Sequence, residues 1–262
     1  MMSKNKLIVD CATLAGKVML ESNAESYRVE ETIVKILETS DLSVTEAITM
    51  TTGIIFTLDD PKTDDPPFTV VRRIHERSNQ LRNIQSVNNI SRALTAGKIT
   101  PEEAYEQLLI VEESEYSQGI KTIGSMFLVL GFTILLGGLD LKAMLVSLLT
   151  GLLVGSSSSL KSRFNITSFL YALLTTTFVS FLVYLIGYFS GMSSMAINVV
   201  ITASFMPMYP GTSLTNGIRD TLKGDYISGV ARIVESLVVA SSLALGVAVG
   251  LSLYNGVISW TY

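Results

Sequence analysis

The chain has 262 residues, a mean hydropathy of +0.45 and a net charge of −4. It is therefore too apolar for an ordinary soluble protein and not basic enough for a nucleic-acid-binding one. Its one cysteine, Cys11, excludes an intramolecular disulfide framework and is expected to be a small buried side chain. Charge divides the chain near Gly119, because the residues before it carry 12 Lys and Arg against 19 Asp and Glu, and the remainder carries 7 against 4. This contrast predicts a soluble domain over residues 1–118 and a membrane domain over residues 119–262.

Apolar periodicity and turn residues give the elements of the first domain in chain order. Helical spacing predicts helices over 7–22, 27–37 and 79–96, the first two separated by a break at Ser22-Asn23. Stretches rich in Thr, Ile, Val and Phe predict two strands over 48–58 and 68–74, with a turn-forming bridge over 59–67. Thr100 to Glu103 form a capping box that starts a helix to about residue 115, leading towards the first membrane span. These elements predict a small α+β domain.

Enzyme signatures are missing from the sequence. It contains no GxSxG, HExxH, P-loop or CxxC motif, and its one histidine, His75, is expected to be solvated. We therefore expect no enzymatic activity, no cofactor, no metal site and no nucleic-acid partner.

Five apolar stretches follow, and they predict an all-α polytopic domain of about five transmembrane helices. The expected spans lie near residues 120–139, 141–157, 166–189, 194–208 and 227–254. The second and fourth stretches are short for a bilayer crossing.

Basic residues recur at every second boundary between these spans, which places them on one side of the membrane. The boundaries on the other side contain one basic residue, Lys142. Because Lys and Arg near membrane ends are retained in the cytoplasm, this pattern predicts a cytoplasmic first domain. Five crossings then put the C-terminus outside, with Trp260 and Tyr262 in an interfacial aromatic belt. An even number of spans would break this pattern.

The segment after the fourth span combines helix breakers with polar residues. Pro207 and Pro210 interrupt the helix, and Gly211 frees the backbone. Asn216, Arg219 and Asp220 follow within about three turns. One interpretation is a solute site, in which freed amides and a new helix N-terminus attract an anion. The other is a cytoplasmic loop whose prolines only end a helix, and composition favours the two equally.

Two further patterns in the membrane half each have two interpretations. Arg232 and Glu235 lie on one helical face, where they either line a cavity, with Glu235 as a proton-linked carboxylate, or form a solvated ion pair at the membrane edge. The pairs Gly151/Gly155 and Gly246/Gly250 are GxxxG motifs, which serve either close helix packing within the chain or dimerisation.

Short motifs in both halves resemble those of the threonine/serine exporter family. In the first half they are SNAESYRVE at 22–30, TTGI at 51–54, VN at 87–88, SR at 91–92 and GKIT at 97–100. In the second half they are PMYPG at 207–211, NG at 216–217, Asp220, GDY at 224–226 and Gly229. The resemblance covers nearly the whole chain.

The layout resembles the larger subunit of the split, two-subunit members of this family, which include a bacterial succinate exporter. The resemblance implies efflux of small polar metabolites, either amino acids such as threonine and serine or dicarboxylates such as succinate. It also implies coupling to the proton motive force and a small hydrophobic membrane subunit as partner in a hetero-oligomer. The alternative is a regulatory or scaffold subunit whose partner carries the transport path.

Overall fold

A computed structural model describes residues 4–40, 42–62, 66–114 and 116–259, which fold into two compact units. The first unit contains the described residues up to 114 and also Gly211–Val234. The second contains residues from Tyr116 to Pro210 and those from Glu235 onwards. Residues 211–234 follow the expected boundary at residue 118 by almost a hundred positions, yet they pack with the N-terminal unit. Their polar side chains find their partners there, as described below.

The helices of the first unit that precede residue 114 agree with the periodicity of the sequence. They are α1 (Lys4–Glu21), α2 (Ser26–Leu37), α3 (Leu81–Thr95) and α4 (Pro101–Glu113). The predicted capping box is confirmed, because Thr100 Oγ1 accepts from the Glu103 amide at 3.3 Å and Glu103 Oε2 accepts from the Thr100 amide at 2.9 Å. Helix α4 ends at Glu113 and α5 begins only at Gln118, so no continuous helix joins this unit to the first span.

The predicted strand over residues 48–58 is wrong, because that stretch turns back on itself. It contributes to two strands, β1 (Val44–Met50) and β2 (Gly53–Asp59), which pair antiparallel from Met50↔Gly53 onwards. The turn, Thr51-Thr52, consists of residues that favour strands, so it gives no turn signal. Strand β3 (Phe68–Arg73) pairs antiparallel with β2 and completes the sheet in the order β1-β2-β3.

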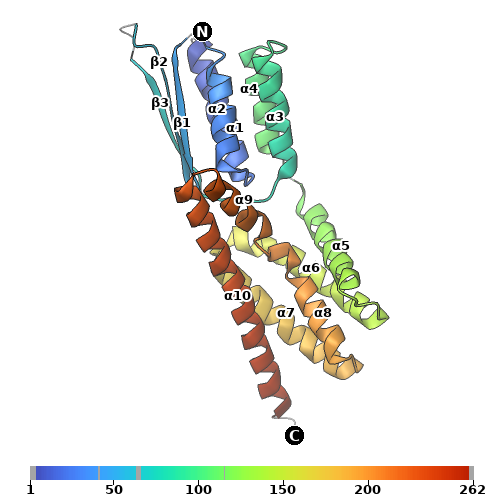
Figure 1. Cartoon of the computed structure of the whole chain (residues 1–262). Helices are drawn as coiled ribbons and strands as arrows, with labels where there is room; N and C mark the ends of the chain where they lie inside the picture. Colours follow the sequence, from blue (N-terminus) through green and yellow to red (C-terminus); the bar gives the residue numbers. More distant parts are fainter. Residues whose placement is uncertain (1–3, 41, 63–65, 115, 260–262) are drawn as a thin grey trace. The chain divides into compact units, whose positions relative to one another are not determined.

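The core of this unit lies between the sheet and the helices. Figure 1 shows α1 and α2 between the sheet and the α3–α4 pair. Alternate residues of β2, namely Ile54, Phe56 and Leu58, are buried against the helices. Cys11 is fully buried, as expected, and burial raises the pKa of its thiol to about 12.

The second unit consists of apolar helices. They are α5 (Gln118–Leu135), α6 (Leu141–Arg163), α7 (Ser168–Ser190), α8 (Ser194–Ser204) with the short 3₁₀ helix η1 (Met206–Met208), and the C-terminal part of α10 (Tyr226–Ser259). Among the described helices, α5, α6, α7 and α10 are long and apolar enough to cross a membrane. The expected fourth span, Ser194–Met208, is too short by the same measure. The expected external C-terminus depends on that segment crossing, and Trp260 and Tyr262 lie outside the described residues.

Both GxxxG motifs pack helices within the chain. A Cβ atom added to Gly151 or Gly155 would lie 2.6 or 2.7 Å from backbone Cα atoms of α5. One added to Gly246 would lie 1.8 Å from Thr176 Oγ1, and one at Gly250 would lie 2.1 Å from Ser180 Oγ, both on α7. Small residues therefore let α6 approach α5, and α10 approach α7, at backbone distance.

The packing of α10 on α7 predicts that two glycines of α10 differ sharply in how much their replacement by alanine destabilises the protein. We expect Gly246→Ala to lower the thermal midpoint of the detergent-solubilised protein, because overpacking typically costs about 1–3 kcal/mol. Gly256→Ala is the matched control, since nothing lies within 4 Å of its added Cβ. Equal midpoints for the two variants would show that α10 does not contact α7 at Gly246.

Candidate functional site

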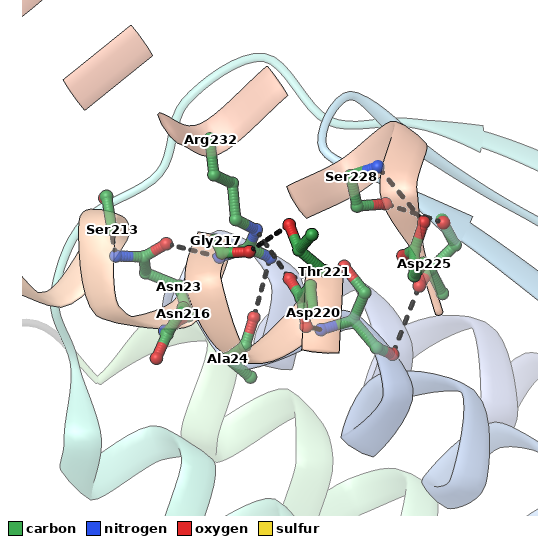
Figure 2. Close-up of polar contacts among 12 residues, drawn as sticks. Asn23, Ala24, Ser213, Asn216, Gly217, Asp220, Thr221, Asp225, Ser228 and Arg232 are labelled. Carbon is green, nitrogen blue, oxygen red and sulfur yellow. Dashed lines mark hydrogen bonds and ion pairs between the residues drawn. The ribbon is translucent and has the colours of Figure 1, made fainter. Parts of the chain in front are cut away.

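The side chain of Arg232 is fully buried in the first unit. Its Nη1 donates to Asn23 Oδ1 and its Nη2 to the Ala24 carbonyl oxygen, each at 2.8 Å. Its Nε lies 3.2 Å from Asp220 Oδ2 in an ion pair that is also fully buried. Figure 2 shows Arg232 reaching from α10 towards these partners. The desolvation of a guanidinium costs several kcal/mol, so the charge is tolerable only because these acceptors surround it.

Two glycines let α9 (Gly211–Leu222) cross the start of α10 closely enough for this pair to form. A Cβ atom at Gly217 would lie 2.9 Å from the Gly229 carbonyl oxygen, and one at Gly229 would lie 2.7 Å from the Thr221 amide nitrogen. The turn between the helices contains Gly224 in the left-handed region, at φ 95°. The glycines thus bring Asp220 and Arg232 together from two different helices.

Asp220 connects α9 to the N-terminus of α2. Its Oδ1 accepts from the Ser26 amide at 3.1 Å and its Oδ2 from the Ser26 hydroxyl at 3.2 Å. Burial raises the pKa of Asp220 above its ordinary value, although Arg232 and Ser26 both favour the ionised form. A carboxylate at a helix N-terminus is also stabilised by the helix dipole.

Asn23 lies at the break between α1 and α2, with φ at 63°. Asparagine tolerates this left-handed conformation better than other residues with a side chain. Its Nδ2 donates to Ser213 Oγ at 3.0 Å and to Asn79 Oδ1 at 2.8 Å, and its carbonyl oxygen accepts from Asn216 Nδ2 at 2.7 Å. Asn23 thereby joins the α1–α2 turn to α9 and to the segment before α3.

Glu25 is bound by two arginines. Its Oε1 accepts from Arg219 Nη1 at 2.7 Å and its Oε2 from Arg28 Nη1 at 3.1 Å. The Glu25 side chain is 8% exposed, whereas that of Arg219 is 58% exposed. Burial alone would raise the pKa of Glu25, but hydrogen bonds from its own backbone amide and from the two arginines hold it below its ordinary value.

These elements enclose a polar pocket of about 810 Å³ in the first unit. Its ionisable lining consists of Arg28, Arg92, Arg219 and Glu25, which leaves an excess of positive charge. The remaining lining is mostly amide and hydroxyl side chains: Ser22, Asn23, Asn79, Gln85, Asn88, Asn89, Thr212, Thr215 and Asn216, with Gly211, Leu81 and Ile84. Such a lining suits a small, polar, negatively charged solute. In the described part of the chain, no cluster of three or more acidic, histidine or cysteine side chains could hold a metal ion.

Three of the residues expected to form a solute site, Gly211, Asn216 and Arg219, line this pocket, and Asp220 is buried on the same helix. The other three belong to the second unit. Pro207 is in η1, Pro210 directly precedes α9, and Glu235 is an exposed residue of α10.

The interpretation of Arg232 as part of a solvated ion pair at the membrane edge is wrong, because the side chain is buried against Asp220.

Sequence reasoning missed the half of the pocket that lies outside α9. None of Asn23, Glu25, Arg28 and Arg92 was expected to be a site residue. The break at Ser22-Asn23 was the available signal, because an asparagine between two helices often adopts a left-handed conformation. Arg92 belongs to the SR motif at 91–92 that resembles the family's, but no local pattern gives it a role in a site.

Because Arg232 is buried, we expect its replacement to destabilise the segments around it strongly. Arg232→Gln leaves Asp220 without its ion-pair partner, a change that typically costs about 3–5 kcal/mol. We expect faster hydrogen exchange in α9 and in residues 22–26, measured by mass spectrometry on the full chain. Lys35→Gln is the control, because it removes an exposed ion pair with Glu31 that is worth about 1 kcal/mol or less. If both variants exchange like the unmodified chain, the ion pair does not hold α9 in place.

Comparisons with known proteins identify the family of the chain. A family model described as "Putative threonine/serine exporter" matches residues 10–254. A curated "Probable threonine/serine exporter" of Mycobacterium tuberculosis (strain ATCC 25618 / H37Rv) is 24% identical to the chain over 250 residues. The alignment covers 93% of the chain and 46% of that protein, so the chain spans about half the length of this relative. No solved structure matches the chain. Because the family model covers nearly the whole chain and four described helices are apolar enough to cross a bilayer, this is a multi-pass membrane protein of the threonine/serine exporter family.

Proposed function

We propose that the chain is a subunit of an exporter that moves small polar metabolites out of the bacterial cytoplasm. One observation carries this proposal beyond family membership. The chain passes from the apolar helix α8 through Pro207 and Pro210 directly into α9, whose Gly211, Asn216 and Arg219 line a charged polar pocket. A broken helix followed by polar groups is a common way for carriers to form solute sites.

A small hydrophobic membrane subunit is proposed as the partner. The support is the layout of the chain, which resembles the larger subunit of the two-subunit members of the family. In this hetero-oligomer the first unit lies in the cytoplasm, the side that the basic residues at the start of α5 and at the end of α6 favour. The solutes are amino acids such as threonine and serine, or dicarboxylates such as succinate.

The proton motive force is the proposed energy source, and Glu235 is the proposed proton-linked carboxylate. It is the acidic residue within the apolar helix α10, where a charge is costly unless it faces water, a cavity or a partner. Its side chain is exposed on the surface of this chain, a position from which it can reach a second subunit.

A scaffold or regulatory role is the second candidate, and one observation favours it. Asn216, Asp220 and Arg232 all make structural hydrogen bonds or ion pairs inside the first unit. Their replacement would therefore disturb assembly even if the partner carried the whole transport path.

An efflux assay with separate subunits distinguishes the two roles. We expect export of labelled threonine or succinate from proteoliposomes only when the chain and its small partner are both present. Export by the partner alone would favour the scaffold role. Deletion of residues 1–114 is a poor test, because it would expose the buried pair of Asp220 and Arg232.

Two charge-neutralising variants test the assigned residues. We expect Asp220→Asn and Glu235→Gln to reduce efflux at least tenfold, since the first loses a buried charge and the second a proton-linked group. Glu106→Gln, an exposed residue of α4, is the control for removing one acidic charge. Membrane insertion and co-purification with the partner would be checked for each variant. Unchanged efflux in correctly inserted, paired variants would refute the site assignment.

A further inference from the structure

We propose that a groove between α6 and α7 of the second unit binds an anionic phospholipid, with an acyl chain in the groove and the phosphate on basic residues at its end. The groove has a volume of about 390 Å³. Its apolar lining consists of Leu153, Leu160, Ile166, Leu174, Phe178 and Val179. The inference goes beyond the proposed function and does not depend on which solute the chain exports.

The groove lies on helices that can cross a bilayer. Leu141–Lys161 of α6 and the whole of α7 are long and apolar enough for a membrane span. Three lining residues are about half exposed at the surface of the chain, namely Leu160, Leu174 and Phe178, at 51, 53 and 56%. An apolar surface on such helices faces hydrocarbon in the membrane, so an acyl chain is the occupant that the groove suits.

One end of the groove is positively charged. Lys161, in the last turn of α6, donates to Ser168 Oγ at the start of α7, at 3.1 Å. Its Nζ also lies 5.9 Å from the centroid of the Tyr171 ring, which lines the groove. Arg163, two residues further on, is exposed. These contacts hold the ammonium group of Lys161 beside the groove, where it can bind the phosphate of a lipid whose chain lies in the groove.

Internal carboxylates do not neutralise these two cations. The acidic residues of the second unit are Asp140 and Glu235. Asp140 precedes the opposite end of α6, about 30 Å from Lys161 at a rise of 1.5 Å per residue. In the described part of the chain, neither Lys161 nor Arg163 forms an ion pair. A phosphate at this end would therefore meet two positive charges that no acidic side chain already occupies.

The groove and the cations together select one class of ligand. Basic residues at the end of a pocket between membrane helices are typical of sites for anionic lipid headgroups. A lipid with a neutral headgroup would gain only the apolar contacts of the groove, and a free phosphate would gain only the charge of Lys161 and Arg163. An anionic phospholipid gains both.

Native mass spectrometry of the full chain in detergent, titrated with lipid, tests this inference. We expect phosphatidylglycerol to bind at least fivefold more tightly than phosphatidylcholine with the same acyl chains. Lys161→Gln is expected to weaken phosphatidylglycerol binding about fivefold, the usual contribution of one cation near anionic lipid. Lys161→Arg keeps the charge and is expected to bind like the unmodified chain. Lys142→Gln is the matched control, since Lys142 lies at the other end of α6 and donates to the Ser190 carbonyl oxygen of α7 at 2.7 Å.

A variant that fills the groove tests the place of the acyl chain. Ser156 lines the groove, so Ser156→Trp is expected to weaken the binding of both lipids severalfold and to keep the preference for phosphatidylglycerol. Leu145→Trp is the control, because Leu145 is an exposed residue of α6 outside the groove. Glycerol 3-phosphate, which has the phosphate but no acyl chain, is expected not to displace the bound lipid.

Four outcomes would overturn the inference. They are equal binding of the two lipids, equal affinities in Lys161→Gln and Lys142→Gln, unchanged binding in Ser156→Trp, and displacement of the lipid by an equal concentration of glycerol 3-phosphate. The last would indicate a site for free phosphate. None of these measurements involves efflux, so the lipid site and the proposed transport function can fail separately.

Discussion

The buried charge of Arg232 is the constraint on which the first unit depends. A guanidinium without water needs acceptors on several sides, and these come from Asp220, Asn23 and the Ala24 carbonyl. The acceptors lie on segments that are about 200 residues apart in sequence, so the charge is satisfied only when the α1–α2 turn and α9 fold together. A network of this kind is all or none, because losing one member leaves the others buried and unsatisfied.

In both units, glycines let two helices approach each other closely, but the contacts that result are different. In the first unit, Gly217 and Gly229 let two helices meet so that charged side chains can pair across them. In the second unit, Gly246 and Gly250 let α10 meet hydroxyl-bearing residues of α7, where close packing compensates for the missing hydrophobic driving force. The same small residue thus serves a polar network in one unit and van der Waals contact in the other.

Much of the fold could be predicted because the signals are local. Helical periodicity located α1 to α4, the Thr100–Glu103 capping box fixed the start of α4, and hydropathy located α5, α6, α7 and α10. The hairpin between β1 and β2 was missed because Thr51 and Thr52 favour strands. The sequence also shows helix-breaking residues over 207–211, and the polar residues that follow them lie on α9. No local pattern could show that they pair with Asn23 and Glu25, since such pairing is a property of tertiary contact.

The position of Glu25 has a consequence for the charge of the pocket. A pocket that already contains a carboxylate of its own must give part of its positive charge to that group before any solute arrives. An anionic solute would then gain less from charge neutralisation on entering than it would from three unpaired arginines. Glu25 thus lowers the net positive charge that an anionic solute would meet in the pocket, and it does so from within the chain itself.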